Sequence, residues 1–338
     1  MGTPQLEDEA TVPRDGLTVP RTNLGEAMER ANINGVELEY EVRGSGESVL
    51  LISPVVAGAF LPFMSVPALA DHYRLVRYHK RGWGGSTHTA PPVSIADHAA
   101  DAAALLEHLG IARAHVAGHS SGGAIALQLA FDRPELVGSL ALFEPSLLRL
   151  PSAQPLFARA AHSFEAYRGG DHAGAVAGFL SVVSGLDWDT CHAVIDEHVP
   201  GGVAQSIRDA DTFFGVELPA LGEWEFGPEQ AAAITQPVLS VLGNDTDRLW
   251  VEVADLLQSW FPQVEQLAIE GAGHLLQMQR PEPVARGLAE FLGRHPMLAV
   301  EGSLTSLRLP DRTVSGCAPT DAVPDSGLGR PVDQALCR

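Results

Sequence analysis

Lysine is almost absent from this chain of 338 residues: only Lys80 occurs, and the remaining strongly basic residues are arginines. Acidic residues number 42 against 22 basic ones, which gives a formal net charge of −20. The sequence contains no cluster of lysine or arginine residues that would form a basic patch. Nucleic acids and anionic membrane surfaces are themselves polyanions, so neither is expected to be a partner.

Cysteine is also scarce. The three cysteines, Cys191, Cys317 and Cys337, are too few and too scattered for a disulfide framework, and free thiols in a reducing cytoplasm are expected. The sequence has no His-Glu-x-x-His motif and no Cys/His cluster, so neither a metal ion nor a cofactor is expected. Residues 1–29 carry acids where a signal peptide has basic and apolar residues, which again favours a cytoplasmic protein.

One uncharged stretch, residues 49–70, is long enough to span a bilayer. Three prolines and a glycine interrupt it: Pro54, Gly58, Pro62 and Pro67. A buried strand over residues 49–53 followed by a proline-rich loop fits better than a spanning helix, so no membrane association is expected.

Short apolar runs alternate with helical patterns in residues 30–145 and again in residues 236–295. This alternation predicts an α/β fold, a mostly parallel central sheet flanked by helices. Residues 146–235 show only helical stretches broken by glycine and proline, which predicts an inserted helical cap. The two ends of the chain, residues 1–29 and 296–338, are polar and without periodicity, and we expect them to be disordered.

A serine lies between glycines in the segment Gly118-His119-Ser120-Ser121-Gly122, between an apolar run and a helical stretch. A strand that reverses sharply into a helix holds its turn residue at strained backbone angles, and small residues on either side let the backbones pass. The pattern therefore predicts a nucleophile elbow that exposes the Ser120 hydroxyl at the positive end of a helix. An ordinary strand–turn–helix corner is the alternative.

A serine hydroxyl needs a neighbouring base, itself oriented by an acid. His274 is the strongest candidate, because a small-residue loop after the last predicted strand would place it at the carboxyl edge of the sheet. A surface histidine is the alternative. His119 in the elbow points away from Ser120, and we interpret it and His115 as packing residues.

These features together resemble the α/β-hydrolase superfamily over about residues 30–295. The elbow, the loop Arg81–Ser86, the turn Gly243-Asn244-Asp245-Thr246-Asp247 and the loop Gly271–His274 carry the resemblance, in the family's order of nucleophile, acid and histidine. The glycine-rich loop also invites a phosphate-binding interpretation, but its lysine precedes the glycines, against the order that such a loop requires.

The resemblance leaves the acid open among three carboxylates. Asp247 is favoured, in a turn one residue longer than usual because Thr246 occupies the family's position. Glu144 is the rival, since haloalkane dehalogenases and a fungal lactonase of the superfamily take the acid from the end of the preceding strand. Asp245 is the third choice.

The resemblance also implies an oxyanion hole. Relatives carry His-Gly after the third strand, where this chain has Ser53-Pro54. Proline has no N–H, so the implied donors are the backbone amides of Val55 and Ser121.

The implied activity is that of a serine hydrolase that cleaves a carboxylic ester or lactone through an acyl-enzyme. An acidic cap containing aromatic residues favours a neutral, fairly apolar small molecule as substrate. The alternatives are a cofactor-free perhydrolase or haloperoxidase-type enzyme, and a non-catalytic ligand binder with this fold. The oligomeric state, a homo-oligomer included, stays open.

Overall fold

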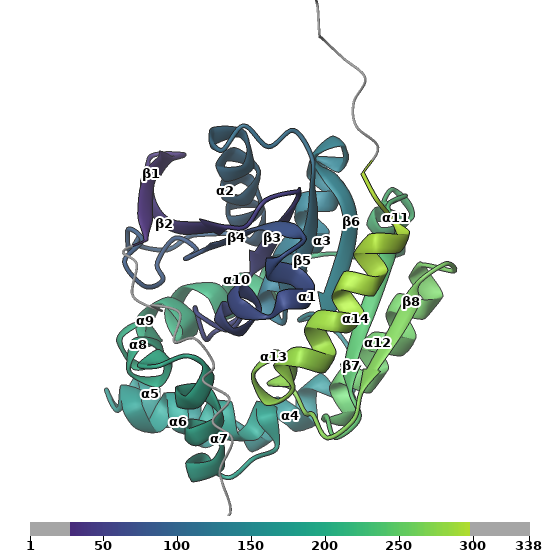
Figure 1. Ribbon diagram of the computed structural model, residues 1–338. Helices are drawn as coiled ribbons and strands as arrows, with labels where there is room; N and C mark the ends of the chain where they lie inside the picture. The colour runs from purple at the N-terminus through teal and green to yellow at the C-terminus, as the bar shows by residue number, and fades with distance from the viewer. Residues whose placement is uncertain (1–27, 298–338) are drawn as a thin grey trace, which may run out of the picture. The chain divides into compact units, whose positions relative to one another are not determined.

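The computed structural model describes residues 28–297 (Figure 1). The sequence predicts disorder in residues 1–29 and 296–338. Nearly all of these residues lie outside the described part of the chain. A single eight-stranded sheet organises the molecule, in the order β1-β2-β4-β3-β5-β6-β7-β8. Both pairings of β2 are antiparallel and the remaining pairings are parallel. The strands are β1 (Glu29–Ile33), β2 (Val36–Arg43), β3 (Glu47–Ile52), β4 (Tyr73–Tyr78), β5 (Ala114–His119), β6 (Val137–Phe143), β7 (Val238–Gly243) and β8 (Glu265–Ile269).

The first two strands form an antiparallel hairpin. Asn34 and Gly35 make its turn with φ angles of 48° and 79°, the left-handed pair that matches the twist of the strands. The central strands β5 and β6 are buried at every residue. Continuous apolar runs of this kind are typical of parallel strands covered on both faces.

Two apolar cores lie on opposite faces of the sheet, because side chains alternate along a strand. Leu50 and Ile52 of β3 belong to one core, while Val49 and Leu51 belong to the other. Helices α2 (Ile95–His108), α3 (Ser121–Asp132) and α12 (Arg248–Trp260) contribute to the first core. The second core contains residues of η1 (Leu61–Ser65), α1 (Pro67–Ala70), α13 (Leu276–Gln279) and α14 (Pro281–Arg294).

All the chain between β6 and β7 is helical or loop. It comprises α4 (Ala153–Arg159), α5 (Ala161–Arg168), α6 (His172–Ser184), α7 (Trp188–His198), α8 (Gly202–Arg208), α9 (Ala210–Thr212), the π-helical turn η3 (Phe213–Glu217), α10 (Leu218–Glu223) and α11 (Pro228–Ala232). Figure 1 shows α5 to α9 grouped together beside the sheet. We refer to α4–α11 as the inserted helices.

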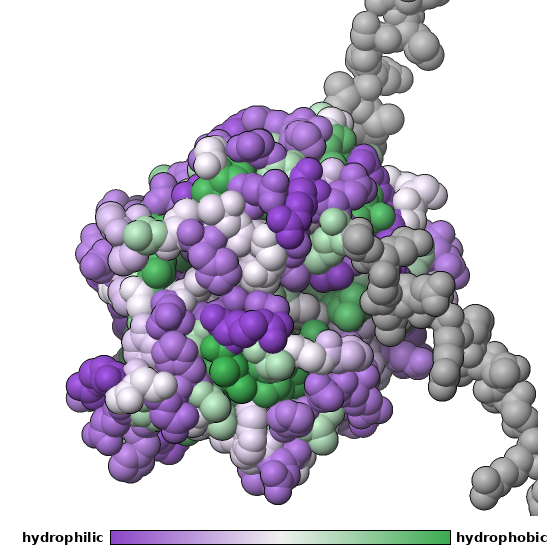
Figure 2. Space-filling model, turned by 90° about the vertical axis from the view of Figure 1, so that its left-hand side faces the viewer, coloured by the Kyte–Doolittle hydropathy of each residue, from purple (hydrophilic) through white to green (hydrophobic). Residues whose placement is uncertain are grey.

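The surface of the molecule in Figure 2 is mainly hydrophilic, in keeping with the high net charge of the chain. Hydrophilic residues dominate the face in Figure 2, and apolar residues reach it only in small groups. Within residues 28–297, no helix combines the length and the apolar character needed to cross a bilayer. The uncharged stretch at residues 49–70 instead contains the last four residues of β3 and the short helices η1 and α1.

Candidate active site

Ser120 stands at the tip of a sharp turn between β5 and α3. Its backbone angles, φ 53° and ψ −117°, are strained for a residue with a side chain. A Cβ atom on Gly118 would lie 2.2 Å from the Gly122 carbonyl oxygen, and one on Gly122 would lie 2.0 Å from the Ile52 carbonyl oxygen. The glycines around the serine are therefore required by close backbone contact, which is the geometry of a nucleophile elbow.

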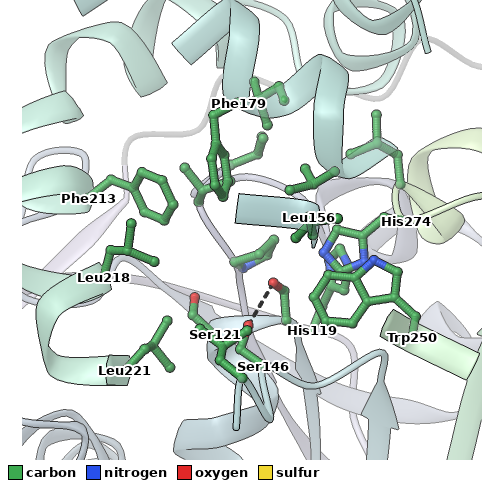
Figure 3. A pocket seen from close by; sticks show the side chains of 18 of the residues that line it. His119, Ser121, Ser146, Leu156, Phe179, Phe213, Leu218, Leu221, Trp250 and His274 are labelled. Carbon is green, nitrogen blue, oxygen red and sulfur yellow. Dashed lines mark hydrogen bonds between the residues drawn. The ribbon is translucent and has the colours of Figure 1, made fainter. Parts of the chain in front are cut away.

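Ser120 lines a cavity beside the elbow. Its remaining polar lining includes Ser121, Ser146 and His274, all close to the elbow. The inserted helices supply an apolar wall: Leu156, Phe179, Phe213, Leu218 and Leu221. Figure 3 shows Phe213, Leu218 and Leu221 across the cavity from His274 and its neighbour Trp250. The cavity thus has a polar reacting end and an apolar body.

His274 is hydrogen bonded to Glu144 rather than to either aspartate of the turn after β7. Its Nδ1 lies 2.6 Å from Glu144 Oε2, and both side chains are buried. The Gly243 N–H donates to Glu144 Oε1 at 2.9 Å, and the Thr246 hydroxyl donates to Oε2 at 3.0 Å. The carboxylate therefore has partners on both oxygens, and the Nε2 of His274 is left to face another group.

Burial shifts the pKa of both partners toward the uncharged form. It raises the pKa of Glu144, although the hydrogen bonds from Gly243 and Thr246 oppose that rise. It lowers the pKa of His274 from its ordinary value of 6.5 to about 3. A histidine with so low a pKa is a free base at neutral pH.

Asp247, which the sequence favours as the acid, is not the hydrogen-bond partner of His274. Asp247 caps α12 by accepting the Leu249 N–H at 3.0 Å, and it also pairs with Arg159. Asp247 thus stands at the N-terminal end of the helix, as its N-cap. Asp245, the third choice, lines a surface depression together with Asp247. The structure brings neither aspartate into hydrogen-bond contact with His274.

Three residues around the nucleophile were not anticipated. The Ser120 hydroxyl is hydrogen bonded to that of Ser146 at 3.1 Å (dashed in Figure 3) and not to His274. The indole ring of Trp250 stacks on the His274 ring. Gln277 lies with its amide nitrogen 2.8 Å from Nδ1 of His119, so His119 is held inside the protein beside His274. None belongs to a motif, and only their place in the fold reveals them.

The two expected oxyanion donors line the same cavity as Ser120. Ser121 is the first residue of α3, where backbone N–H groups have no partner within the helix. Val55 follows Pro54 in the loop after β3, and its carbonyl accepts a hydrogen bond of 3.4 Å from Ser206 of α8. Both residues thus lie on the wall of the cavity that Ser120 lines. Within residues 28–297, no cluster of three or more His, Cys, Asp or Glu side chains could hold a metal ion.

The chain belongs to the α/β-hydrolase family. A family model described as "alpha/beta hydrolase fold" matches residues 56–281, and the eight-stranded sheet confirms the predicted fold.

Among curated relatives, YugF of Bacillus subtilis, named an uncharacterized hydrolase, is 25% identical over 78% of this chain and 97% of its own length. A soluble epoxide hydrolase of a Corynebacterium species is 26% identical over 78% of this chain and 96% of its own. RutD of Azorhizobium caulinodans, whose name refers to carbamate hydrolysis, is 36% identical, but the match spans only 34% of this chain and 43% of that relative.

Solved structures share the fold at low sequence identity. A thermophilic esterase from Thermogutta terrifontis has a TM-score of 0.66 and 23% identity, over 79% of this chain and all of its own. The enol-lactonase from Burkholderia xenovorans has a TM-score of 0.61 and 21% identity, over 78% of this chain and all of its own. The homologues support a hydrolytic enzyme, and the likeness to these two structures concerns the fold alone.

Proposed function

We propose that the protein is a serine hydrolase that cleaves a carboxylic ester or lactone of a neutral, fairly apolar small molecule. The observation that carries the proposal is the buried hydrogen bond between Glu144 and His274, since His274 lines the same cavity as the strained Ser120. Nucleophile, base and orienting acid are the three parts that acyl transfer by serine requires.

In the proposed reaction Ser120 Oγ attacks the carbonyl carbon while His274 Nε2 accepts its proton. Glu144 holds the imidazole through Nδ1 and stabilises the imidazolium that forms. The amides of Val55 and Ser121 donate to the oxyanion. His274 then protonates the leaving alkoxide, and water activated by the same nitrogen releases the acyl group. A rotation of the Ser120 side chain, away from Ser146 and toward His274, starts the cycle.

The cavity supports the proposed class of substrate. Its polar groups are confined to the neighbourhood of the elbow, and its body is aliphatic and aromatic. A ligand in this cavity would bury its apolar surface against the aliphatic and aromatic side chains. Its one ester or lactone group would lie at the polar end, beside Ser120. The formal charge of −20 disfavours anionic substrates. We propose that the inserted helices act as the cap that keeps water from this site.

Two of the relatives are named for other activities. The epoxide hydrolase relative shares the family, but opening an epoxide through an ester intermediate needs a carboxylate nucleophile, and residue 120 is serine. The name of RutD refers to carbamates, which are attacked at a carbonyl as esters are, but its match covers a minority of both chains. The serine elbow favours acyl transfer.

The test is covalent labelling followed by a substrate panel. A fluorophosphonate should label the wild-type protein on Ser120 and should leave Ser120→Ala unlabelled. The wild type should hydrolyse members of a panel of neutral esters and lactones and discriminate against matched anionic ones. A fully folded protein that resists the reagent and cleaves no ester or lactone would instead be a ligand binder. Bromide oxidation that depends on peroxide would indicate the haloperoxidase alternative.

A further inference from the structure

The single lysine of the chain is buried between the sheet and the inserted helices. Lys80 follows β4, and its Nζ lies 2.6 Å from Glu217 Oε2, with side-chain exposures of 1% and 0%. Glu217 ends the π-helical turn η3. Its neighbour Leu218 and the first residue of that turn, Phe213, both line the cavity. The ion pair therefore joins the core to the segment that forms the apolar wall.

Lys80 makes a second contact, to the nucleophile elbow. Its Nζ donates to Ser121 Oγ at 3.2 Å. The same residue, Ser121, supplies one of the two proposed oxyanion amides. One ammonium group thus connects the oxyanion side of the site to a carboxylate of the inserted helices.

Trp83 strengthens the same contact from the glycine-rich loop. Its indole N–H donates to Glu217 Oε2 at 2.9 Å, and its ring lies 4.8 Å from Lys80 Nζ. One carboxylate oxygen therefore accepts from two donors, and the aromatic face adds a cation–π contact to the lysine. Phe213 packs on Trp83 with ring centroids 6.3 Å apart.

The glycines of this loop contact the inserted helices as well. The Thr212 hydroxyl donates to the Gly82 carbonyl at 2.6 Å, and the Gly84 N–H donates to Asp209 Oδ2 at 3.0 Å. A Cβ atom on Gly82, whose φ is 83°, would lie 2.6 Å from the Thr212 methyl carbon. The loop that invites a phosphate-binding interpretation is occupied by the segment of residues 209–217.

We propose that Lys80 is a positioning residue, which holds Ser121 so that its amide faces the oxyanion and ties that position to Glu217 of the cap. The proposal rests on the proposed function. A pair of apolar side chains of similar volume could fasten the two parts equally well, because buried ion pairs are often no more stabilising than good apolar packing. An apolar pair could not donate to Ser121, and that donor is what the charged pair adds.

Single and double variants of Lys80 and Glu217 distinguish an effect on the position of Ser121 from an effect on the stability of the fold. Lys80→Met or Glu217→Leu alone leaves a buried charge unpaired and should lower the melting temperature strongly. The double variant Lys80→Met/Glu217→Leu removes both charges and should recover part of that loss, since the buried indole N–H of Trp83 still lacks its acceptor. We expect its kcat to stay roughly 10- to 100-fold low with little change in KM, since a displaced oxyanion donor acts on the transition state.

Ser121→Ala tests the same link in an intact fold. It keeps the ion pair and the backbone amide and removes the hydroxyl through which Ser121 contacts Lys80 and Glu217, so a loss of kcat similar to that of the double variant is expected. Adding Ser121→Ala to the double variant should cause little further loss, because both changes break one contact. Thr212→Val is the matched control: it removes a bond between loop and cap that does not involve Ser121, and should leave kcat within about twofold.

The measurements are kcat and KM on an ester that the wild type cleaves, the rate of inactivation by a fluorophosphonate, and the melting temperature. A double variant that is stable and as fast as wild type, or a Ser121→Ala variant without loss, would overturn the positioning role while the proposed hydrolase stands. A wild type that the reagent does not label on Ser120 would instead remove the proposed function, and the positioning role with it.

Discussion

The rings of His274 and Trp250 are stacked with their centroids 4.0 Å apart and their planes inclined by 4°. Trp250 belongs to α12, whose first turn is capped by Asp247. The stack fixes the plane of the imidazole, while the hydrogen bond from Nδ1 to Glu144 fixes its rotation within that plane. Together these two contacts fix the direction in which Nε2 of His274 can accept a proton.

Trp250→Leu should therefore lower kcat, and because Trp250 is buried in the core it should also lower the melting temperature. Contacts between stacked rings contribute about 0.5–1.5 kcal/mol, which corresponds to a loss of roughly 2- to 12-fold. The control is Trp260→Leu, the same change in the same helix, at a ring that packs on Phe226 away from the site. Steady-state kinetics on one ester would decide: equal losses in both variants would show that the stack does not orient the base.

The two carboxylates compared for the acid should respond in opposite ways. Glu144→Gln keeps the shape of the side chain but removes the charge that stabilises the imidazolium, and we expect kcat to fall about 10³- to 10⁴-fold. Asp247→Ala should keep kcat within a few-fold and lose about 1 kcal/mol of stability, since it removes the N-cap of α12. Ester hydrolysis gives kcat for both variants, and urea unfolding gives their free energy of unfolding. A large kcat loss in Asp247→Ala with normal activity in Glu144→Gln would contradict the assignment.

The parts of the site that depend on neighbours in sequence could be predicted before the structure. A strand, two small residues around Ser120 and a helix are all encoded within one short segment, so the elbow follows from local sterics. Position 246 also carries a signal, because a threonine where the family places its acid favours Glu144.

The remainder depends on contacts between distant segments. Glu144 bonds to Gly243 and Thr246, which lie 99 and 102 residues further along the chain, and only the pairing of β6 with β7 brings them together. Lys80 and Glu217 are separated by 137 residues. The rarity of lysine was visible from the composition, but its partner depends on how η3 packs against the core.

The pH dependence of kcat/KM should reflect the buried base. Burial lowers the pKa of His274 from 6.5 to about 3, so the neutral, proton-accepting form persists as the pH falls below 6.5. The acid limb of kcat/KM, which belongs to the hydrogen-bonded pair of Glu144 and His274, should therefore be centred below pH 6.5. A profile of kcat/KM against pH, with stability checked at each point, measures this. An acid limb centred at or above pH 6.5 would contradict the inferred burial of the base.

Ser146 holds the nucleophile in a resting position, and its removal should free it. The 3.1 Å hydrogen bond to Ser120 competes with the one that Ser120 must make to His274 before attack. A neutral hydrogen bond contributes about 1 kcal/mol net, so Ser146→Ala should raise the rate of fluorophosphonate labelling by up to roughly fivefold. Ser152→Ala, a buried serine that does not line the cavity, is the control and should not change the rate. A tenfold or greater loss in Ser146→Ala would mean that Ser146 assists the attack and does not restrain it.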